Sequence, residues 1–306
     1  MKLATFVIKA TGEKTIGVFQ DEKFLDVVSL SNGAVPANMQ VLLEMGADAL
    51  AQVSEIAAAA DGASHAYSAE EVELQSPVRP GKIIHTSCNF DAHLEELEGW
   101  EAKEWQDHGW DQFHFEHPTG FLEAPSCIVG SGVGIEIPRF TEQLDFEIEV
   151  GIVIGKRCKN VSVEEAMDKV AGLMIFNDVS ARDIQAREHA NNVILLGKSF
   201  DGSCPFGPYL VTLDELEDVN NLEMKLYLNG ELRQDSNTKN THYNMAELVS
   251  WWSHMTLEPG DVITTGSPPG VISGMKDPVW MKPGDLIEAH VEGLGCLVTP
   301  IVKSAA

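Results

Sequence analysis

The chain has 306 residues, 44% of them hydrophobic, which is enough for a sizeable core and one large domain, alone or with a small appendage. Its 47 Asp and Glu against 21 Lys and Arg give a net charge of -26, and such an acidic protein repels nucleic acid and anionic membranes. No run of about 18 apolar residues is present, so no transmembrane helix is expected. The five cysteines are scattered and form no C-x-x-C pair, which argues against a disulfide framework and a zinc site and fits a reducing cytoplasm.

The N-terminal part reads as short strands followed by a helix. Residues 1–30 are apolar-rich and broken by Gly, Asp and Lys, so we expect the start to be the first strand of the fold and not a signal peptide. Residues 38–60 favour a helix. The segment SPVRPGK, with two prolines and a glycine, indicates a boundary. We therefore predict a small N-terminal αβ domain at 1–76 and a catalytic domain at 77–306.

The larger part is mainly β. From residue 126 onward short strands close on Gly, Pro and Asn, and only 161–172 and 243–256 favour helix. The fold class expected is therefore α+β and strand-rich. Residues 91–118 stand apart because they carry three of the six Trp and four of the ten His. Such an aromatic, charged stretch predicts a lid, and the alternatives are a surface subdomain or a dimer contact.

The segment LDFEIEVGIVIG at 144–155 alternates carboxylates with apolar residues. In a strand Asp145, Glu147 and Glu149 share one face, and the apolar run that follows indicates a central, buried strand. Buried carboxylates repel one another unless protons, cationic side chains or a metal ion lie between them. Oxygen-only ligands suit Mg²⁺, Mn²⁺ or Ca²⁺. The alternative is an edge strand with its carboxylates in water.

Three further residues are candidates for chemistry. Asp178 follows the apolar segment LMIF, where it is either a third oxygen ligand or a helix N-cap. His93 and Glu96 are three apart and share a face of a helical turn, so the carboxylate can orient an imidazole that deprotonates water. The plainer interpretation of that pair is a surface ion pair.

Four motifs now follow one another over roughly residues 80–303: E-x-E, N-D-x-S-A-R-D-x-Q, G-K-S-F-D and T-G-S-P-P-G. In order and spacing they resemble the fumarylacetoacetate hydrolase family. The resemblance implies a mixed β-roll or sandwich catalytic domain with a smaller N-terminal domain, usually in a homodimer. It also implies a Mg²⁺, Mn²⁺ or Ca²⁺ ion held by two Glu and one Asp, which match Glu147, Glu149 and Asp178.

The resemblance also implies roles around that ion. Lys198, Gln185 and Arg182 match family positions that hold substrate and developing negative charge. In the turn TTGSPPGV, the Ser267 hydroxyl and nearby backbone at Gly266 match a part of the family that meets a substrate carboxylate.

Two features depart from the family pattern. Glu123 stands where many members have a Lys, which changes the charge near the pocket. His93 and Glu96 match a motif of the family's short-chain members, but the segment 97–118 that follows is longer than is usual in those members.

The predicted function is a metal-dependent hydrolase that cleaves a C–C bond of a 2,4-dioxo acid, an acylpyruvate or a diketo-deoxy sugar acid. His93 with Glu96 would activate water, and Lys198 would stabilise the developing charge. The alternative is a 2-oxo acid decarboxylase, or an isomerase or hydratase of unsaturated 2-oxo diacids in aromatic catabolism. A remote alternative is a non-catalytic module that binds small acids. A Cys88–His93 nucleophile is a further reading, although no thiol-enzyme motif surrounds Cys88.

Overall fold

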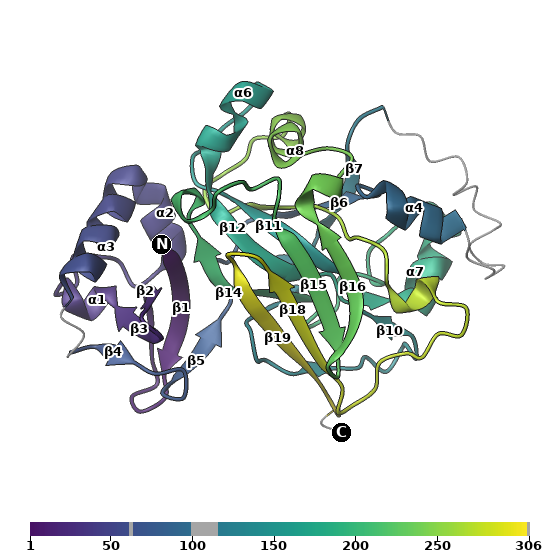
Figure 1. Ribbon diagram of the computed structural model, residues 1–306, viewed down its shortest axis with the longest axis horizontal. Helices are drawn as coiled ribbons and strands as arrows, with labels where there is room; N and C mark the ends of the chain where they lie inside the picture. Colours follow the sequence, from purple (N-terminus) through teal and green to yellow (C-terminus); the bar gives the residue numbers. More distant parts are fainter. Residues whose placement is uncertain (61–63, 99–115, 305–306) are drawn as a thin grey trace.

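A computed structural model describes residues 1–60, 64–98 and 116–304 and has a strand-rich α+β fold (Figure 1). Most of the strands form one twelve-stranded sheet. Across this sheet the order is β4 (Ala66–Tyr67), β3 (Lys23–Asp26), β2 (Glu13–Gln20), β1 (Lys2–Ile8), β14 (Cys204–Val211), β12 (Val170–Asn177), β11 (Ile148–Ile154), β17 (Val262–Thr264), β6 (Ile83–Ser87) and β7 (Thr119–Glu123), with β5 (Val72–Gln75) on β1 and β8 (Ile128–Val129) on β14.

A second sheet packs on the middle of the first. It runs β16 (Glu231–Asn237), β15 (Glu223–Leu228), β18 (Leu286–Val291), β19 (Gly295–Val302) and β9 (Ile135–Glu136). Figure 1 shows it in front of β11 and β12, and apolar side chains of both sheets form one buried cluster. Because β11 and β12 are covered in this way, polar groups at their ends are held away from bulk water.

The helices lie around the sheets. Within the described residues the α-helices are α1 (Val27–Leu30), α2 (Met39–Met45), α3 (Ala47–Ala59), α4 (Asp91–Glu98), α6 (Val163–Ala166), α7 (Arg182–His189) and α8 (Met245–Trp252). The first three cover the N-terminal strands, and their apolar side chains join a core shared with β12 and β14 (Figure 1). Strand β1 pairs with β14, so the N-terminal strands continue the large sheet. The domain boundary near residue 76 stays a prediction.

Several expected elements differ in detail. The helix predicted at 38–60 is two helices, because Gly46 between them has a φ of 84°. The helix predicted at 161–172 ends by Lys169 in a 3₁₀ turn, and strand β12 begins at Val170. The lid predicted at 91–118 is described only at its ends, where α4 covers 91–98, and its residues 99–115 lie outside the described part.

The strand predicted at 144–155 is central and buried, but it is not continuous. Strand β11 lies between β12 and β17, and all seven of its residues are buried, so the edge-strand alternative is wrong. Two residues before it, the chain leaves this ladder, and Leu144–Asp145 forms β10, which pairs with β13 (Ser180–Ala181) instead. The three carboxylates therefore do not form one row.

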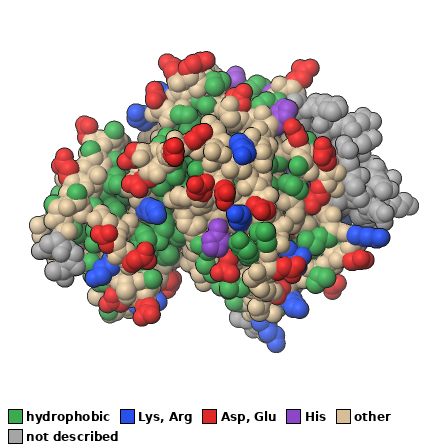
Figure 2. All heavy atoms as spheres, viewed as in Figure 1, with side chains coloured by type: hydrophobic (Ala, Val, Ile, Leu, Met, Phe, Trp, Pro, Cys, Tyr) green, Lys and Arg blue, Asp and Glu red, His purple; other side chains and the backbone are tan. Residues whose placement is uncertain are grey.

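Figure 2 shows acidic side chains spread over the visible face of the molecule, with fewer Lys and Arg among them. Among the described helices, none is both long and apolar enough to cross a membrane.

Candidate active site

The carboxylates and basic groups singled out in the sequence meet in one largely buried pocket. It opens where the start of β11, the end of β12, helices α4 and α7 and the turn after β17 come together. Its cavity measures about 80 Å³. The lining includes most of the candidates, namely His93, Glu147, Glu149, Asp178, Arg182, Gln185, Lys198 and Ser267.

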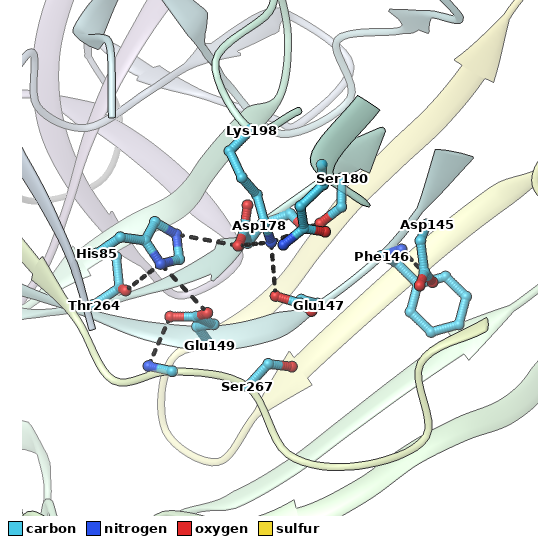
Figure 3. Close-up of polar contacts among 12 residues, drawn as sticks. His85, Asp145, Phe146, Glu147, Glu149, Asp178, Ser180, Lys198, Thr264 and Ser267 are labelled. Atoms are coloured by element: carbon cyan, nitrogen blue, oxygen red, sulfur yellow. Dashed lines mark hydrogen bonds and ion pairs between the residues drawn. The ribbon is translucent and has the colours of Figure 1, made fainter. Parts of the chain in front are cut away.

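Glu147, Glu149 and Asp178 form the acidic wall of this pocket (Figure 3). The backbone N–H of Asp178 donates to the Glu147 carbonyl, which ties the end of β12 to the start of β11. Asp178 follows the last residue of β12 and is not the N-cap of α7, since that position is Ala181. The N-cap alternative is therefore wrong, and the Asp178 side chain is available to the pocket.

Cations contact two of these carboxylates. The Arg182 guanidinium donates to Glu147 at 2.6 Å, and the Lys198 ammonium donates to Glu147 Oε2 at 3.0 Å and to Asp178. Lys198 is 3% exposed, so it is not an ordinary surface lysine. Its third donor bond goes to the Ser180 hydroxyl at 2.7 Å. Buried and fully bonded, Lys198 is held as a cation beside the acidic wall.

The charges perturb the pKa values of all three carboxyl groups. Burial, together with Asp178 and Glu147, raises the pKa of Glu149 well above its usual range. Burial and the charge of Glu147 raise the pKa of Asp178 to about 7, although Lys198 opposes this. Burial would also raise the pKa of Glu147, but Arg182 and Lys198 hold it well below the usual range. Without a further cation, Glu149 and Asp178 therefore favour their protonated forms more than ordinary carboxyl groups do.

This donor set fits a divalent cation. One oxygen from each of the three carboxylates lies within 4.8 Å of the other two. Among the described residues, Asp178 Oδ1 is buried without a hydrogen-bond partner, which leaves an acceptor for an ion. An oxygen-only set suits hard ions such as Mg²⁺, Mn²⁺ or Ca²⁺.

A histidine–carboxylate pair forms another wall. His93 and Glu96 lie on α4 as predicted, and His93 Nδ1 is 2.9 Å from Glu96 Oε2. The other oxygen of Glu96 accepts a hydrogen bond from the backbone of Gly270 at 3.0 Å. Gly270 has a φ of 109°, and a Cβ there would lie 2.2 Å from the Arg233 carbonyl, so only glycine fits the turn. His93 is buried at the pocket and the Glu96 side chain is 18% exposed, so the pair is not an ordinary surface ion pair.

The turn after β17 contacts the acidic wall as well. The backbone N–H of Gly266 donates to Glu149 Oε2 at 2.8 Å, at a φ of 78° that favours glycine. The Ser267 hydroxyl lines the pocket and accepts a hydrogen bond from Gln234 at 2.9 Å. The side-chain oxygen of Gln185 accepts a hydrogen bond from Arg182 at 3.0 Å, which leaves the side-chain amide nitrogen of Gln185 as a donor.

Comparison with known proteins identifies the family. The model of the fumarylacetoacetate (FAA) hydrolase C-terminal domain matches residues 82–302. The chain belongs to the fumarylacetoacetate hydrolase family. It is 36% identical to a mitochondrial oxaloacetate tautomerase of Xenopus laevis over 99% of this chain and 90% of that protein.

Solved structures of the family share the fold. The chain superposes with a TM-score of 0.81 and 32% identity on a fumarylacetoacetate hydrolase from psychrophilic Exiguobacterium antarcticum, covering 99% of this chain and 100% of the other. It superposes with a TM-score of 0.71 and 27% identity on a 5-carboxymethyl-2-hydroxymuconate delta-isomerase from Mycobacterium smegmatis, over the same shares of the two chains. A hydrolase, isomerase or decarboxylase activity fits this family.

Two further residues lie behind the acidic wall of the pocket: His85, which was missed in the sequence, and Glu123, which was noted there only as a departure from the family pattern. His85 on β6 lies 3.4 Å from Asp178, and Glu123 on β7 lies 3.5 Å from His85. Both are 2% exposed. A signal for His85 was available, because a histidine inside an otherwise apolar strand needs a polar partner. Its partners, Glu123 and Asp178, are far from it in the sequence, so no local pattern indicated them.

The Cys88–His93 alternative is not supported by the thiol's surroundings. Burial, and then the charge of Glu147, raise the pKa of the Cys88 thiol to about 12. A protonated thiol is a poor nucleophile. All five cysteines are free.

Proposed function

We propose that this protein is a divalent-metal-dependent tautomerase that interconverts the keto and enol forms of a small 2-oxo dicarboxylic acid of the oxaloacetate type. The observation that carries the proposal is the make-up of one pocket, in which an oxygen-only carboxylate triad, two buried cations and an oriented imidazole line a cavity of about 80 Å³. The similarity to an oxaloacetate tautomerase over 99% of the chain supports the same choice.

In this proposal Glu147, Glu149 and Asp178 hold the ion. Once bound, a divalent cation stabilises the negative charge that develops on an oxygen when a 2-oxo acid is enolised. The protein supplies the remaining charges. The ammonium of Lys198 and the guanidinium of Arg182 balance the carboxylate and developing enolate charge of the substrate.

The proton is moved by His93. The ring nitrogen not bonded to Glu96 accepts the proton that leaves C3 of the keto acid, while Glu96 holds the ring in place. The electron pair of the broken C3–H bond becomes the C2–C3 double bond, and the C2 oxygen takes the negative charge. Protonation of that oxygen from water gives the enol, and His93 returns its proton to solvent. The reverse sequence gives the keto acid.

The test follows the ultraviolet absorbance of enol-oxaloacetate after dilution, with Mg²⁺, with Mn²⁺ and after EDTA treatment. We expect metal-dependent acceleration that EDTA removes and that falls about 10²- to 10⁴-fold in His93→Ala. The matched control is His242→Ala, because His242 forms a similar pair with Asp91 but is half exposed. No acceleration with metal present would overturn the proposal.

A second candidate is the hydrolase predicted from the sequence. It is favoured by the same His93–Glu96 pair, which can take a proton from water as well as from carbon. Acylpyruvates and 2,4-dioxo sugar acids, incubated with Mg²⁺, test it through release of pyruvate and a second acid. Pyruvate released from oxaloacetate would instead indicate the decarboxylase alternative.

The proposal also covers the cellular compartment and the oligomeric state of the protein. Five free cysteines suit a reducing compartment such as the cytoplasm. The family resemblance favours a homodimer, which sedimentation of the purified chain would check.

A further inference from the structure

A second cluster of potential metal ligands lies beside the first. It consists of His85 from β6, Glu123 from β7 and Asp178 after β12, and one donor atom from each lies within 4.8 Å of the other two. His85 Nε2 is 3.5 Å from Glu123 Oε2 and 3.4 Å from Asp178 Oδ2. Figure 3 shows His85 pointing toward Glu149 and toward Asp178, which Lys198 also contacts.

The ring of His85 is fixed by its neighbours. Strands β6 and β7 pair so that Phe121 lies opposite His85, and the two rings stack at 4.8 Å with an angle of 3° between them. His85 Nδ1 lies 3.2 Å from the Thr264 hydroxyl and 3.8 Å from a Glu149 oxygen. Oxygens on this side favour a proton on Nδ1, which leaves the lone pair of Nε2 directed at Glu123 and Asp178. A ligating histidine commonly has such a partner on its other ring nitrogen.

Two atoms that face one another, His85 Nε2 and Glu123 Oε2, are unsatisfied among the described residues, whereas the Asp178 oxygen nearest His85, Oδ2, is bonded to Lys198 and the other Asp178 oxygen, Oδ1, has no partner. Within the described part of the chain, His85 Nε2, Glu123 Oε2 and Asp178 Oδ1 are buried and have no hydrogen-bond partner. The other Glu123 oxygen accepts a long bond from Ser203, at 3.4 Å, and the Cys204 thiol is a further hydrogen-bonding neighbour of this carboxyl. A lone pair and two carboxylates in contact repel one another, and buried polar atoms without partners cost free energy. A cation between them removes both costs.

The separations match coordination better than hydrogen bonding. Ligands of a tetrahedral ion, with bonds of roughly 2.0–2.1 Å, lie about 3.3–3.4 Å from one another. The two distances from His85 Nε2, 3.4 and 3.5 Å, agree with this spacing. They are longer than the usual N–H···O separation of about 2.9–3.0 Å.

The charges point the same way. Four buried carboxylates lie close together, namely Glu123, Glu147, Glu149 and Asp178. Lys198 contacts Glu147 and Asp178. Arg182 shares its charge between Glu147 and Asp145. One divalent ion on the Glu147–Glu149–Asp178 triad compensates two negative charges. Glu123 lies outside that triad and faces His85.

We propose that His85, Glu123 and Asp178 form a second divalent-metal site, which takes a transition-metal ion such as Co²⁺, Mn²⁺ or Zn²⁺ and shares Asp178 with the first site. The donor set selects the ion class, since an imidazole nitrogen suits these ions and not Mg²⁺. The sequence prediction against zinc rested on cysteine spacing and does not bear on a histidine–carboxylate set. The inference rests on the proposed function only through the shared Asp178.

The experiment counts ions on the full chain. Metal-free protein is saturated with Mg²⁺, titrated with Co²⁺ and passed through a desalting column before elemental analysis, and the visible spectrum reports nitrogen ligation of Co²⁺. We expect wild type to hold one Co²⁺ in the presence of excess Mg²⁺. Glu123→Gln, which keeps the size of the side chain, should weaken Co²⁺ binding at least 100-fold and leave Mg²⁺ binding in place. Glu149→Gln is the matched variant. It should weaken Mg²⁺ binding and leave the visible spectrum of bound Co²⁺ unchanged.

The outcomes separate the two proposals. Mg²⁺ binding without a nitrogen-ligated Co²⁺ overturns the second site and leaves the proposed function standing. Co²⁺ bound equally by wild type and Glu123→Gln also overturns it. If wild type binds Co²⁺ but does not bind Mg²⁺, the result counts against the proposed function and leaves the second site standing. Anomalous diffraction from wild-type crystals soaked in Co²⁺ needs no variant, and a peak in bonding contact with His85 Nε2 is the expected result.

Discussion

Glu96 fixes the imidazole of His93 to the rest of the pocket, with its Oε2 2.9 Å from His93 Nδ1. Its other oxygen is bonded to the backbone of Gly270, so helix α4 and the turn after β17 are joined through one carboxylate. The ring can therefore face the pocket only while this turn keeps its conformation.

Glu96 is accordingly a positioning residue, and its removal should affect turnover more than binding. We expect Glu96→Gln to lower kcat about 10- to 100-fold, less than His93→Ala, with KM nearly unchanged. Since the two residues act as a unit, the double variant should be no slower than His93→Ala. Steady-state kinetics on the four proteins checks this, and additive losses would show that the residues act independently.

Mg²⁺ should stabilise the folded protein by relieving repulsion in the acidic wall. At a Mg²⁺ concentration about 100 times its Kd, binding contributes about 2.7 kcal/mol, which raises Tm by about 5 °C. Glu147→Gln should abolish this increase. Glu258→Gln is the control, because Glu258 pairs with Arg157 at the surface. Scanning calorimetry with and without Mg²⁺ measures the effect. If Mg²⁺ raises the Tm of Glu147→Gln as much as that of wild type, Glu147 is not a ligand of the ion.

Local patterns offered the residues of the acidic wall as candidates, and the family resemblance selected them as ion ligands. Period-two alternation offered Glu147 and Glu149 at the start of the buried strand β11, together with Asp145. The end of an apolar run offered Asp178 after β12 as either a ligand or an N-cap. Spacing along one helical turn identified His93 with Glu96. Each of these signals depends on neighbours in sequence, which is why sequence reasoning could find it.

The remaining parts depend on pairing between distant strands. His85 and Glu123 come together because β6 pairs with β7 and both lie near the end of β12. Period-two alternation also placed Asp145 on the face of Glu147 and Glu149, but the chain changes its pairing partner before β11. No local pattern reports such a change.

Asp145 should consequently behave as a structural residue. Its carboxylate accepts hydrogen bonds from Arg182 at 2.8 Å and from the backbone of Ile272 and Ser273, and Figure 3 shows it apart from the triad. Because it is fully buried, Asp145→Asn leaves Arg182 partly uncompensated and should cost about 3 kcal/mol of unfolding free energy. Urea unfolding measures this loss. Mg²⁺ stoichiometry should remain as in wild type, and its loss would return Asp145 to the ligand set.

Cys88 should be dispensable for chemistry even though it lines the same pocket as His93. Its thiol has a pKa raised to about 12 by burial and by Glu147, so at pH 7 it is protonated, and thiolate forms only as the pH approaches 12. We expect Cys88→Ala to retain kcat within about threefold, because the substitution keeps the Cβ and removes no charge. Iodoacetamide should inactivate wild type slowly at pH 7 and faster as the pH rises. Rapid inactivation at pH 7, together with loss of turnover in Cys88→Ala, would instead identify Cys88 as a nucleophile.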